Sequence, residues 1–332
     1  MHATGDATGV AAGEEPAIAA KVRRRVGPYT LITALDDPHT KLPVPERRYI
    51  ARSIDGQYTV LLSLPQPGGD AQRFLAEADG SRYLLGPCAA PATALAGPGE
   101  PAWYSRPYQP VLPLPTALAV HGGPLPERTV RALGVALAET LAVVHGQGLT
   151  FAGVSPAAVL LAADGPRLSC FGAVRAAAPD GSSRSGLPGL EAGSLPPEQA
   201  SGGLPRPLGD VYALAATLAY AATGHTMPER DELPAALRTV VARCLSRDPS
   251  TRPQLAELIN ALSANANANA NANAGTDSGI GDRSAALLTP GWLPGRVIAA
   301  LAHQSAAVLT ADIPVEAAPA QRTSPLPLTH PN

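Results

Sequence analysis

Cysteine, charge and aromatic residues are all scarce in this sequence of 332 residues. The three cysteines, Cys88, Cys170 and Cys244, are widely separated and form no C-x-x-C pair. They therefore indicate neither a disulfide framework nor a zinc site, and a reducing compartment is the simplest interpretation. Charged residues make up 16% of the chain, against about 25% in an average protein. The net charge of -2 argues against nucleic acid as the main partner.

Long hydrophobic runs are absent too. No stretch approaches the roughly 18 consecutive apolar residues of a membrane helix. The first ten residues, MHATGDATGV, lack the apolar core of a signal peptide. We therefore expect a soluble, cytoplasmic protein without a membrane span.

Low-complexity segments divide the chain. Residues 1–25 are small, polar and without periodicity, which is typical of a disordered arm. Alternating Ala and Asn at the start of 263–289 indicates a linker that has no means of burying surface. The stretch between them, 26–262, is long enough to bury a core, so we expect one folded domain there.

The chain after this linker has an apolar stripe. Apolar residues recur at helical spacing in 290–312, which predicts an amphipathic helix. The stripe consists of Leu293, Val297, Leu301 and Val308. An exposed stripe is unusual in a monomer, so we expect the helix to dock on the rest of the chain rather than on a partner. The last residues, 313–332, are proline-rich and predicted to be disordered.

One stretch of the domain carries an informative motif. Residues 149–172 read LTFAGVSPAAVLLAADGPRLSCFG and are similar to the catalytic segment of eukaryotic-type Ser/Thr protein kinases, H-R-D-L-K-P-x-N-V-L-L followed by D-F-G. The segment most resembles the kinases of high-GC bacteria, and the resemblance covers about residues 26–262. It implies an α+β, two-lobed fold, with a small β-rich N-lobe at 26–109 and a larger helical C-lobe at 110–262. The positions that match the family's scaffold are Glu77, His145, Pro156, Phe171, Gly172, Glu198, Asp210 and Arg252.

The positions that carry the family's chemistry are different. The alignment puts Gly153 at the catalytic Asp, Ala158 at the metal-binding Asn and Cys170 at the Asp of D-F-G. Magnesium prefers oxygen ligands, which an Ala methyl and a thiol do not supply, and glycine has no group that can act as a base. The changed positions are Leu62, at the ATP-pairing Lys, together with Phe151, Ala152, Gly153, Ser155, Ala158 and Cys170.

The expected ATP cleft departs from the family in two further places. The stretch DDPHTKLPVPERRYIA, 36–51, stands where the family has a glycine-rich loop, and it contains three prolines and no glycine. Proline lacks the N–H donor with which such a loop covers ATP phosphates. The alignment also puts Arg106 at the gatekeeper position, where a long cation suits adenine poorly.

The resemblance implies specific contacts for two of the retained residues, and the sequence around Cys170 predicts the character of its thiol. Asp210 begins a buried helix, from which it is expected to bond the backbone of the catalytic loop. Arg252 is expected to pair with Glu198, because an unpaired buried charge is costly. Cys170 is expected to be an inert, partly buried thiol, because its neighbours in the sequence carry no positive charge.

Together these patterns predict a catalytically inactive kinase-like protein, a pseudokinase, rather than an enzyme. Its expected role is to bind or scaffold a protein partner, such as another kinase or its substrate, with no cofactor or metal. The alternative is an active Ser/Thr protein kinase that transfers the γ-phosphate of ATP, with Mg²⁺, through substitute residues such as Asp164 or Asp180. Serines in 182–194 lie where the family has its activation loop, and another kinase could phosphorylate them.

Overall fold

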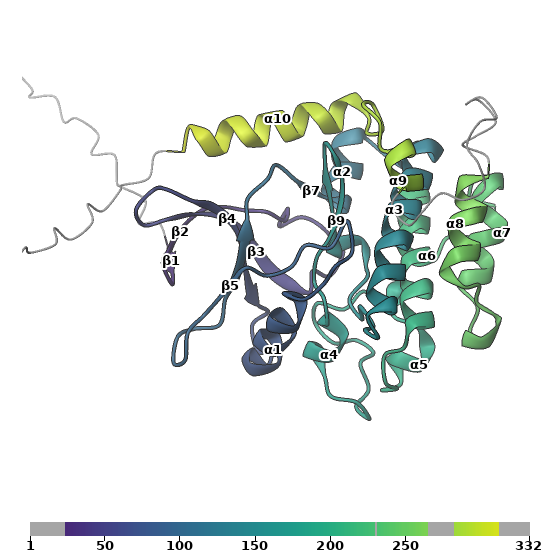
Figure 1. Cartoon of the computed structure of the whole chain (residues 1–332), viewed down its shortest axis with the longest axis horizontal. Coiled ribbons are helices and arrows are strands. Elements are labelled where there is room, and N and C mark those ends of the chain that lie inside the picture. Colours follow the sequence, from purple (N-terminus) through teal and green to yellow (C-terminus); the bar gives the residue numbers. More distant parts are fainter. Residues whose placement is uncertain (1–23, 230, 265–281, 312–332) are drawn as a thin grey trace, which may run out of the picture.

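Two lobes make up the computed structural model of the chain, which describes residues 24–229, 231–264 and 282–311. The first lobe is a six-stranded antiparallel sheet with one helix against it, and the second is mainly helical (Figure 1). This is the two-lobed α+β architecture that the sequence predicted.

The sheet of the first lobe has the strand order β1-β2-β3-β4-β6-β5. Its strands are β1 Arg25–Val26, β2 Tyr29–Ala34, β3 Glu46–Ser53, β4 Thr59–Pro65, β5 Ala94–Leu95 and β6 Tyr104–Pro107. The middle of β4 is buried throughout, because apolar clusters cover both faces of this strand. Helix α1, Ala71–Ser81, follows β4, and the Asp70 carboxylate caps it by accepting hydrogen bonds from the backbone N–H groups of Gln72 and Arg73.

The second lobe is built around helix α3, Glu127–Gly146, which is buried along most of its length. The i, i+3, i+4 spacing of its apolar residues predicts this helix. The other helices of the lobe are α2 Leu114–His121, α4 Ala173–Ala177, α5 Pro197–Ala200, α6 Pro207–Thr223, α7 Ala235–Cys244, α8 Leu255–Ser263 and α9 Asp282–Leu287. A small sheet faces the first lobe, with strands β7 Leu112–Pro113, β8 Val159–Ala162 and β9 Gly165–Leu168.

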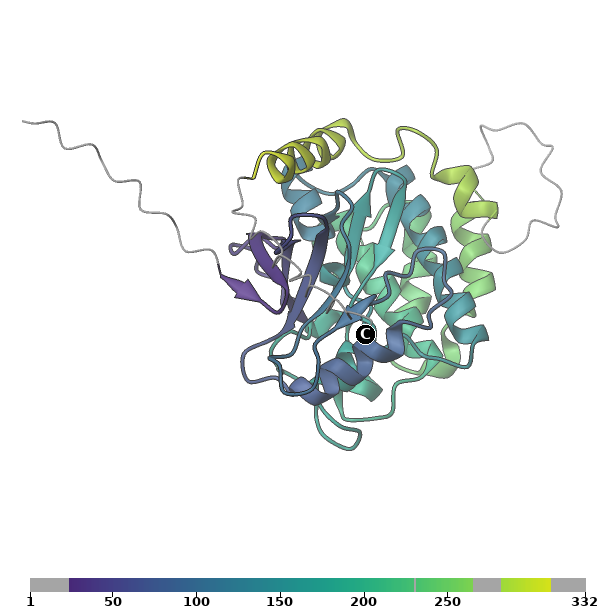
Figure 2. The ribbon, with the colours of Figure 1, turned by 60° about the vertical axis from the view of Figure 1, so that its left-hand side comes forward.

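Helix α10, Gly295–Leu309, lies along one side of both lobes (Figure 1, Figure 2). Its stripe of Val297, Leu301 and Val308 is buried against the rest of the chain, so the expected docking within the chain is present. The helix begins after Pro294, later than the sequence suggested, and α9 lies inside the expected linker. The Ala/Asn repeat from 265 onward, most of the N-terminal arm and the C-terminal tail lie outside the described residues.

Among the described helices, α3 alone is long and apolar enough to cross a membrane by length and composition. Its apolar window is 78% buried inside the protein. The core helix of a globular lobe has these same properties.

Candidate functional site

One buried carboxylate holds the loop that corresponds to the catalytic loop. Asp210, in the first turn of α6, accepts hydrogen bonds from the backbone N–H groups of Phe151 and Ala152, both at 2.8 Å. Its Oδ2 atom also lies 2.9 Å from Nε2 of His145. The expected contact with the loop backbone is therefore present. Ala152 and Cys170 have positive φ angles of 52° and 64°, a conformation that persists only when surrounding contacts enforce it.

The expected pair of Glu198 and Arg252 is formed as well. Nη1 of Arg252 donates to Oε1 of Glu198 at 2.6 Å, and Nη2 donates to Oε2 at 2.9 Å. The Arg252 side chain is fully buried, and it also donates to the carbonyl oxygens of Ser246 and Leu208. The planar guanidinium thus joins the segments around α5, α6 and α8.

The loop has a shape that excludes a side chain at position 153. A Cβ atom built on Gly153 would collide with the backbone carbonyl oxygen of Cys170. The catalytic Asp of the family could therefore not stand here without a shift of this backbone. The adjacent Phe151 is fully buried and packs edge-to-face on Phe171, with 5.5 Å between the ring centres.

Two further changed positions belong to the packing of the same loop. Ser155 caps the short turn Pro156–Ala158 by accepting a hydrogen bond from the Ala158 N–H at 3.3 Å. The Ala158 carbonyl in turn accepts hydrogen bonds from the backbone N–H and the hydroxyl of Ser169. These residues therefore support the loop mainly through its backbone.

The position assigned to the ATP-pairing Lys needs a correction of one residue. Leu62 is fully buried on the outer face of the sheet, in a cluster with Val26 and Trp103. Side chains alternate along a strand, so the next residue, Ser63, faces the cleft. Its hydroxyl donates to Glu46 there at 3.2 Å. Ser63 rather than Leu62 stands where the Lys would point.

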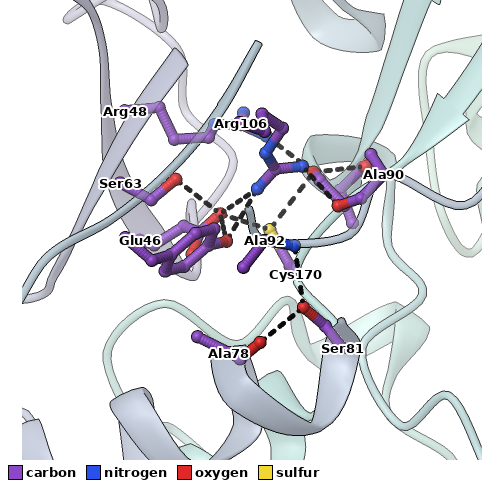
Figure 3. Close-up of polar contacts among 12 residues, drawn as sticks. Glu46, Arg48, Ser63, Ala78, Ser81, Ala90, Ala92, Arg106 and Cys170 are labelled. Atoms are coloured by element: carbon purple, nitrogen blue, oxygen red, sulfur yellow. Dashed lines mark hydrogen bonds and ion pairs between the residues drawn. The ribbon is translucent and has the colours of Figure 1, made fainter. Parts of the chain in front are cut away.

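A buried polar cluster fills the cleft beside Ser63 (Figure 3). The Tyr104 hydroxyl donates to the two Glu46 oxygens at 2.7 and 2.6 Å, and Sγ of Cys170 lies 3.3 Å from Oε1. Nη2 of Arg106 lies 3.6 Å from the same carboxylate and donates to the Tyr104 hydroxyl at 2.7 Å. Burial raises the pKa of both the Tyr104 hydroxyl and the Cys170 thiol, so both groups keep their protons at neutral pH.

Sequence reasoning missed Glu46, which lies at the end of the proline-rich stretch. The available signal was the alternation of strand β3, in which Glu46, Arg48 and Ile50 share one face. The guanidinium of Arg48 forms an ion pair with Asp36 and donates to the Ser169 hydroxyl at 3.3 Å. Arg48 and Glu46 of the first lobe therefore contact the segment that contains Ser169 and Cys170.

Glu77 on α1 has a different partner from the one that the family provides. Arg175 on α4 donates to its two carboxylate oxygens at 2.8 and 2.6 Å. The same guanidinium lies over the ring of Phe171, 4.8 Å from its centre. Glu77 therefore ties α1 to the chain that follows Gly172.

The expected activation loop is anchored by an arginine that sequence reasoning did not single out. Arg184 is fully buried and donates to the Asp180 carboxylate at 2.7 Å and to the Gly203 carbonyl at 2.8 Å. Ser183 and Ser185 on either side are exposed, whereas Ser194 is buried.

The slot that would receive an adenine base is filled by side chains of both lobes. Leu35, Ile50 and Leu61 pack in one cluster with Val111 and Leu160. Each of the five is at most 7% exposed. The walls have the apolar character that a purine requires, but a base can enter only when the lobes separate.

A cavity of about 180 Å³ lies beside the polar cluster. Its lining includes Glu46, Glu77 and Cys170, and residues 187–190 of the expected activation loop contribute to its wall. No group of three or more His, Cys, Asp and Glu side chains in the described residues is arranged to hold a metal. Magnesium that arrives with a nucleotide needs only one or two protein carboxylates, however. Glu46 and Glu77 are carboxylates of this kind, and in the closed structure their oxygens are bound by Tyr104 and Arg175 respectively.

Known proteins resemble this chain in sequence and in structure, although no protein-family model matches it. The chain is 31% identical over 262 residues to a probable serine/threonine-protein kinase, PkwA of Thermomonospora curvata, and 26% identical over 300 residues to the serine/threonine-protein kinase AfsK of Streptomyces coelicolor. These alignments cover 73% and 83% of the chain. The chain spans only about a third of each relative, 34% and 35% respectively.

A solved structure resembles the fold. The kinase domain of PknI from Mycobacterium tuberculosis matches with a TM-score of 0.55 and 22% identity, over 73% of this chain and 97% of that domain. The fold is therefore that of a protein kinase, with a β-rich N-lobe and a helical C-lobe.

The prediction that this chain is not an enzyme needs correction. Its relatives at 26–31% identity are named as Ser/Thr protein kinases, and a protein kinase is an enzyme. The names of the relatives therefore favour the alternative that the sequence left open.

Proposed function

We propose that the chain acts in bacterial protein phosphorylation, as a Ser/Thr protein kinase that uses non-standard residues. The kinases that resemble it match most of the chain. The proposal rests on one observation in the cleft: the carboxylate of Glu46 lies 3.3 Å from the Sγ of Cys170. The first lobe thus brings an acid to the position where the family has the metal-binding Asp of D-F-G.

ATP with Mg²⁺ would supply the phosphoryl group and neutralise its developing charge. In this proposal Glu46 and Glu77 would hold the metal with their carboxylate oxygens, once Tyr104 and Arg175 release them. Arg106 would bind the phosphates in place of the family Lys, since its guanidinium lies beside Glu46 in the polar cluster. The network of Asp210 and His145 keeps the loop in shape.

The proposed reaction is slow. Gly153 offers no base for the attacking hydroxyl, and a general base contributes about 10²–10⁴-fold to such reactions. The closed slot lowers the rate further, because only the fraction of molecules with separated lobes can bind a nucleotide. Slow transfer, and not its absence, is the expected result.

Radiolabelled ATP tests the proposal, with a generic protein acceptor and Mg²⁺ or Mn²⁺. We expect weak labelling by the wild-type protein and none by Glu46→Gln. The matched control is Glu100→Gln, an exposed glutamate with no contact to the cluster among the hydrogen bonds of the described residues, which should label like wild type. Labelling of the wild-type protein no higher than that of a protein-free blank would overturn the proposal, as would equal labelling by Glu46→Gln.

The closed slot favours a second candidate function, the binding of a protein partner. Five apolar side chains hold the lobes together where a nucleotide would bind, and this gives the protein a defined surface in the absence of ATP. The partner in this proposal is another kinase or its substrate, in the cytoplasm. Co-purification of such a protein with wild type and Glu46→Gln alike would support it, and the absence of any partner from native lysate would count against it.

A further inference from the structure

Helix α10 touches the C-lobe, the connecting segment between the lobes and the N-lobe in succession. Its first turns belong to the C-lobe, where Val297 and Leu301 are buried in the main core. Just before the helix, the indole N–H of Trp292 donates to the Ala163 carbonyl at 2.9 Å, and the Thr129 hydroxyl donates to the Trp292 carbonyl at 2.7 Å. This end is firmly attached to the C-lobe.

The middle of α10 is attached to the segment that connects the lobes. The Gln304 amide donates to the Val111 carbonyl at 2.8 Å and accepts from the Val111 N–H at 3.0 Å. Its oxygen also accepts a hydrogen bond from the Tyr108 hydroxyl at 3.2 Å. The side chain of Val111 belongs to the cluster that fills the base slot. One glutamine therefore fixes the backbone about which the lobes would move.

The last turn of α10 is attached to the N-lobe. Val308 is buried in the same cluster as Leu35 and Ile50. Arg52 on β3 donates through Nη2 to the Val308 carbonyl at 2.7 Å and through Nη1 to the Ala311 carbonyl at 3.4 Å. The last carbonyls of a helix lack partners within the helix and carry partial negative charge, so an arginine is a favourable partner for them.

From these contacts we infer that α10 is an intramolecular clamp, which holds the two lobes together and so controls the opening of the cleft. A rise of 1.5 Å per residue gives the helix a reach of roughly 16 Å between its C-lobe and N-lobe anchors. Opening a two-lobed protein requires rotation about the connecting segment. That rotation would break the contacts of Gln304, of Arg52 or of both. The clamp is a property of the fold and does not depend on the proposed reaction.

The thiol of Cys170 reports on the opening of the cleft. It is 5% exposed, and it touches Glu46 of the N-lobe and Ser169 of the C-lobe. Cys244, also buried, lies in the C-lobe core away from the cleft. Separation of the lobes exposes Cys170 and leaves Cys244 buried, whereas unfolding of the C-lobe exposes both.

The experiment measures alkylation of each cysteine in the native protein, residues 1–332, by peptide mass spectrometry. Gln304→Leu and Arg52→Gln keep much of the side-chain volume but lose the anchoring hydrogen bonds. Each should speed labelling of Cys170 on the order of tenfold, with Cys244 unchanged, and the double variant should be faster still. His303→Ala, an exposed neighbour on the same helix, should label like wild type.

Two results would overturn the clamp. One is labelling of Cys170 at the wild-type rate in the double variant. The other is an equal increase in the labelling rates of Cys170 and Cys244, which would show that the substitutions loosen the whole protein. If Gln304→Leu does not fold, Arg52→Gln alone carries the same test, because among the described residues the Arg52 side chain donates hydrogen bonds only to the backbone carbonyls of Val308 and Ala311.

Discussion

At the scale of single residues, Gly153 has little room for a side chain, because an added Cβ atom would collide with the backbone carbonyl oxygen of Cys170. Gly153→Ala places a methyl group on that oxygen, so we expect the free energy of unfolding to fall by about 1–3 kcal/mol. Urea denaturation measures the change. Gly146→Ala is the matched control, because no atom lies within 4 Å of a Cβ built there, and alanine suits its helix better by up to about 1 kcal/mol. Equal stability of the Gly153 variant and wild type would contradict this, because it would show that the backbone shifts to make room for the methyl group without a cost.

The thiol of Cys170 predicts a loss of stability at high pH. Burial raises its pKa above the ordinary value of 9.0, so the folded state retains a proton that the unfolded state releases. The resulting stabilisation is complete below about pH 9 and declines as the pH rises above it. Between pH 9 and 11 the free energy of unfolding of Cys170→Ser should fall less steeply than that of wild type, by about 1.4 kcal/mol per pH unit. Parallel curves for the two proteins would contradict this.

At the scale of elements, α6 and the catalytic-loop segment depend on the Asp210 carboxylate. Asp210→Asn removes one of two acceptor oxygens that serve two backbone N–H groups. We expect a loss of about 2–3 kcal/mol, because hydrogen bonds to a charged group are strong and the freed N–H stays buried. Thermal or urea denaturation measures it, with Asp164→Asn as the control at a side chain that is 70% exposed. A loss no larger than in that control would exclude the supporting role of Asp210.

The elements themselves could be predicted from local pattern. The helical spacing in α3 was visible in the sequence. So were the contact of Asp210 with the loop backbone and the pair of Arg252 with Glu198, since these residues lie in matched motifs. The position of the family Lys was assigned to Leu62 instead of Ser63 because β4 is apolar on both faces. Without an alternation of polar and apolar residues, the sequence does not show which side of the strand faces the cleft. The contact of Glu46 with Cys170 joins residues 124 positions apart. No local pattern marks such a contact.

At the scale of the whole molecule, the packed slot and helix α10 join the lobes into one unit. We therefore expect both lobes to unfold in a single transition. The chain has two tryptophans, Trp103 buried in the N-lobe and Trp292 buried against the C-lobe. Trp292→Phe leaves an N-lobe reporter, and Trp103→Phe leaves a C-lobe reporter.

In each of these variants the fluorescence transition in urea should coincide with the loss of far-UV circular dichroism. The comparison is made within one variant, so differences in stability between the variants do not affect it. A fluorescence midpoint that departs from the circular dichroism midpoint in either variant would show that the lobes unfold separately.

The contact of Arg52 with the Val308 carbonyl also fixes an order of events on the ribosome. The two residues are 256 positions apart. At about 5–20 residues per second, the strand that contains Arg52 emerges roughly 10–50 s before its partner is synthesised. The N-lobe sheet must persist through that interval with Leu35 and Ile50 uncovered by Val308, and this cluster is completed only after α10 has been synthesised.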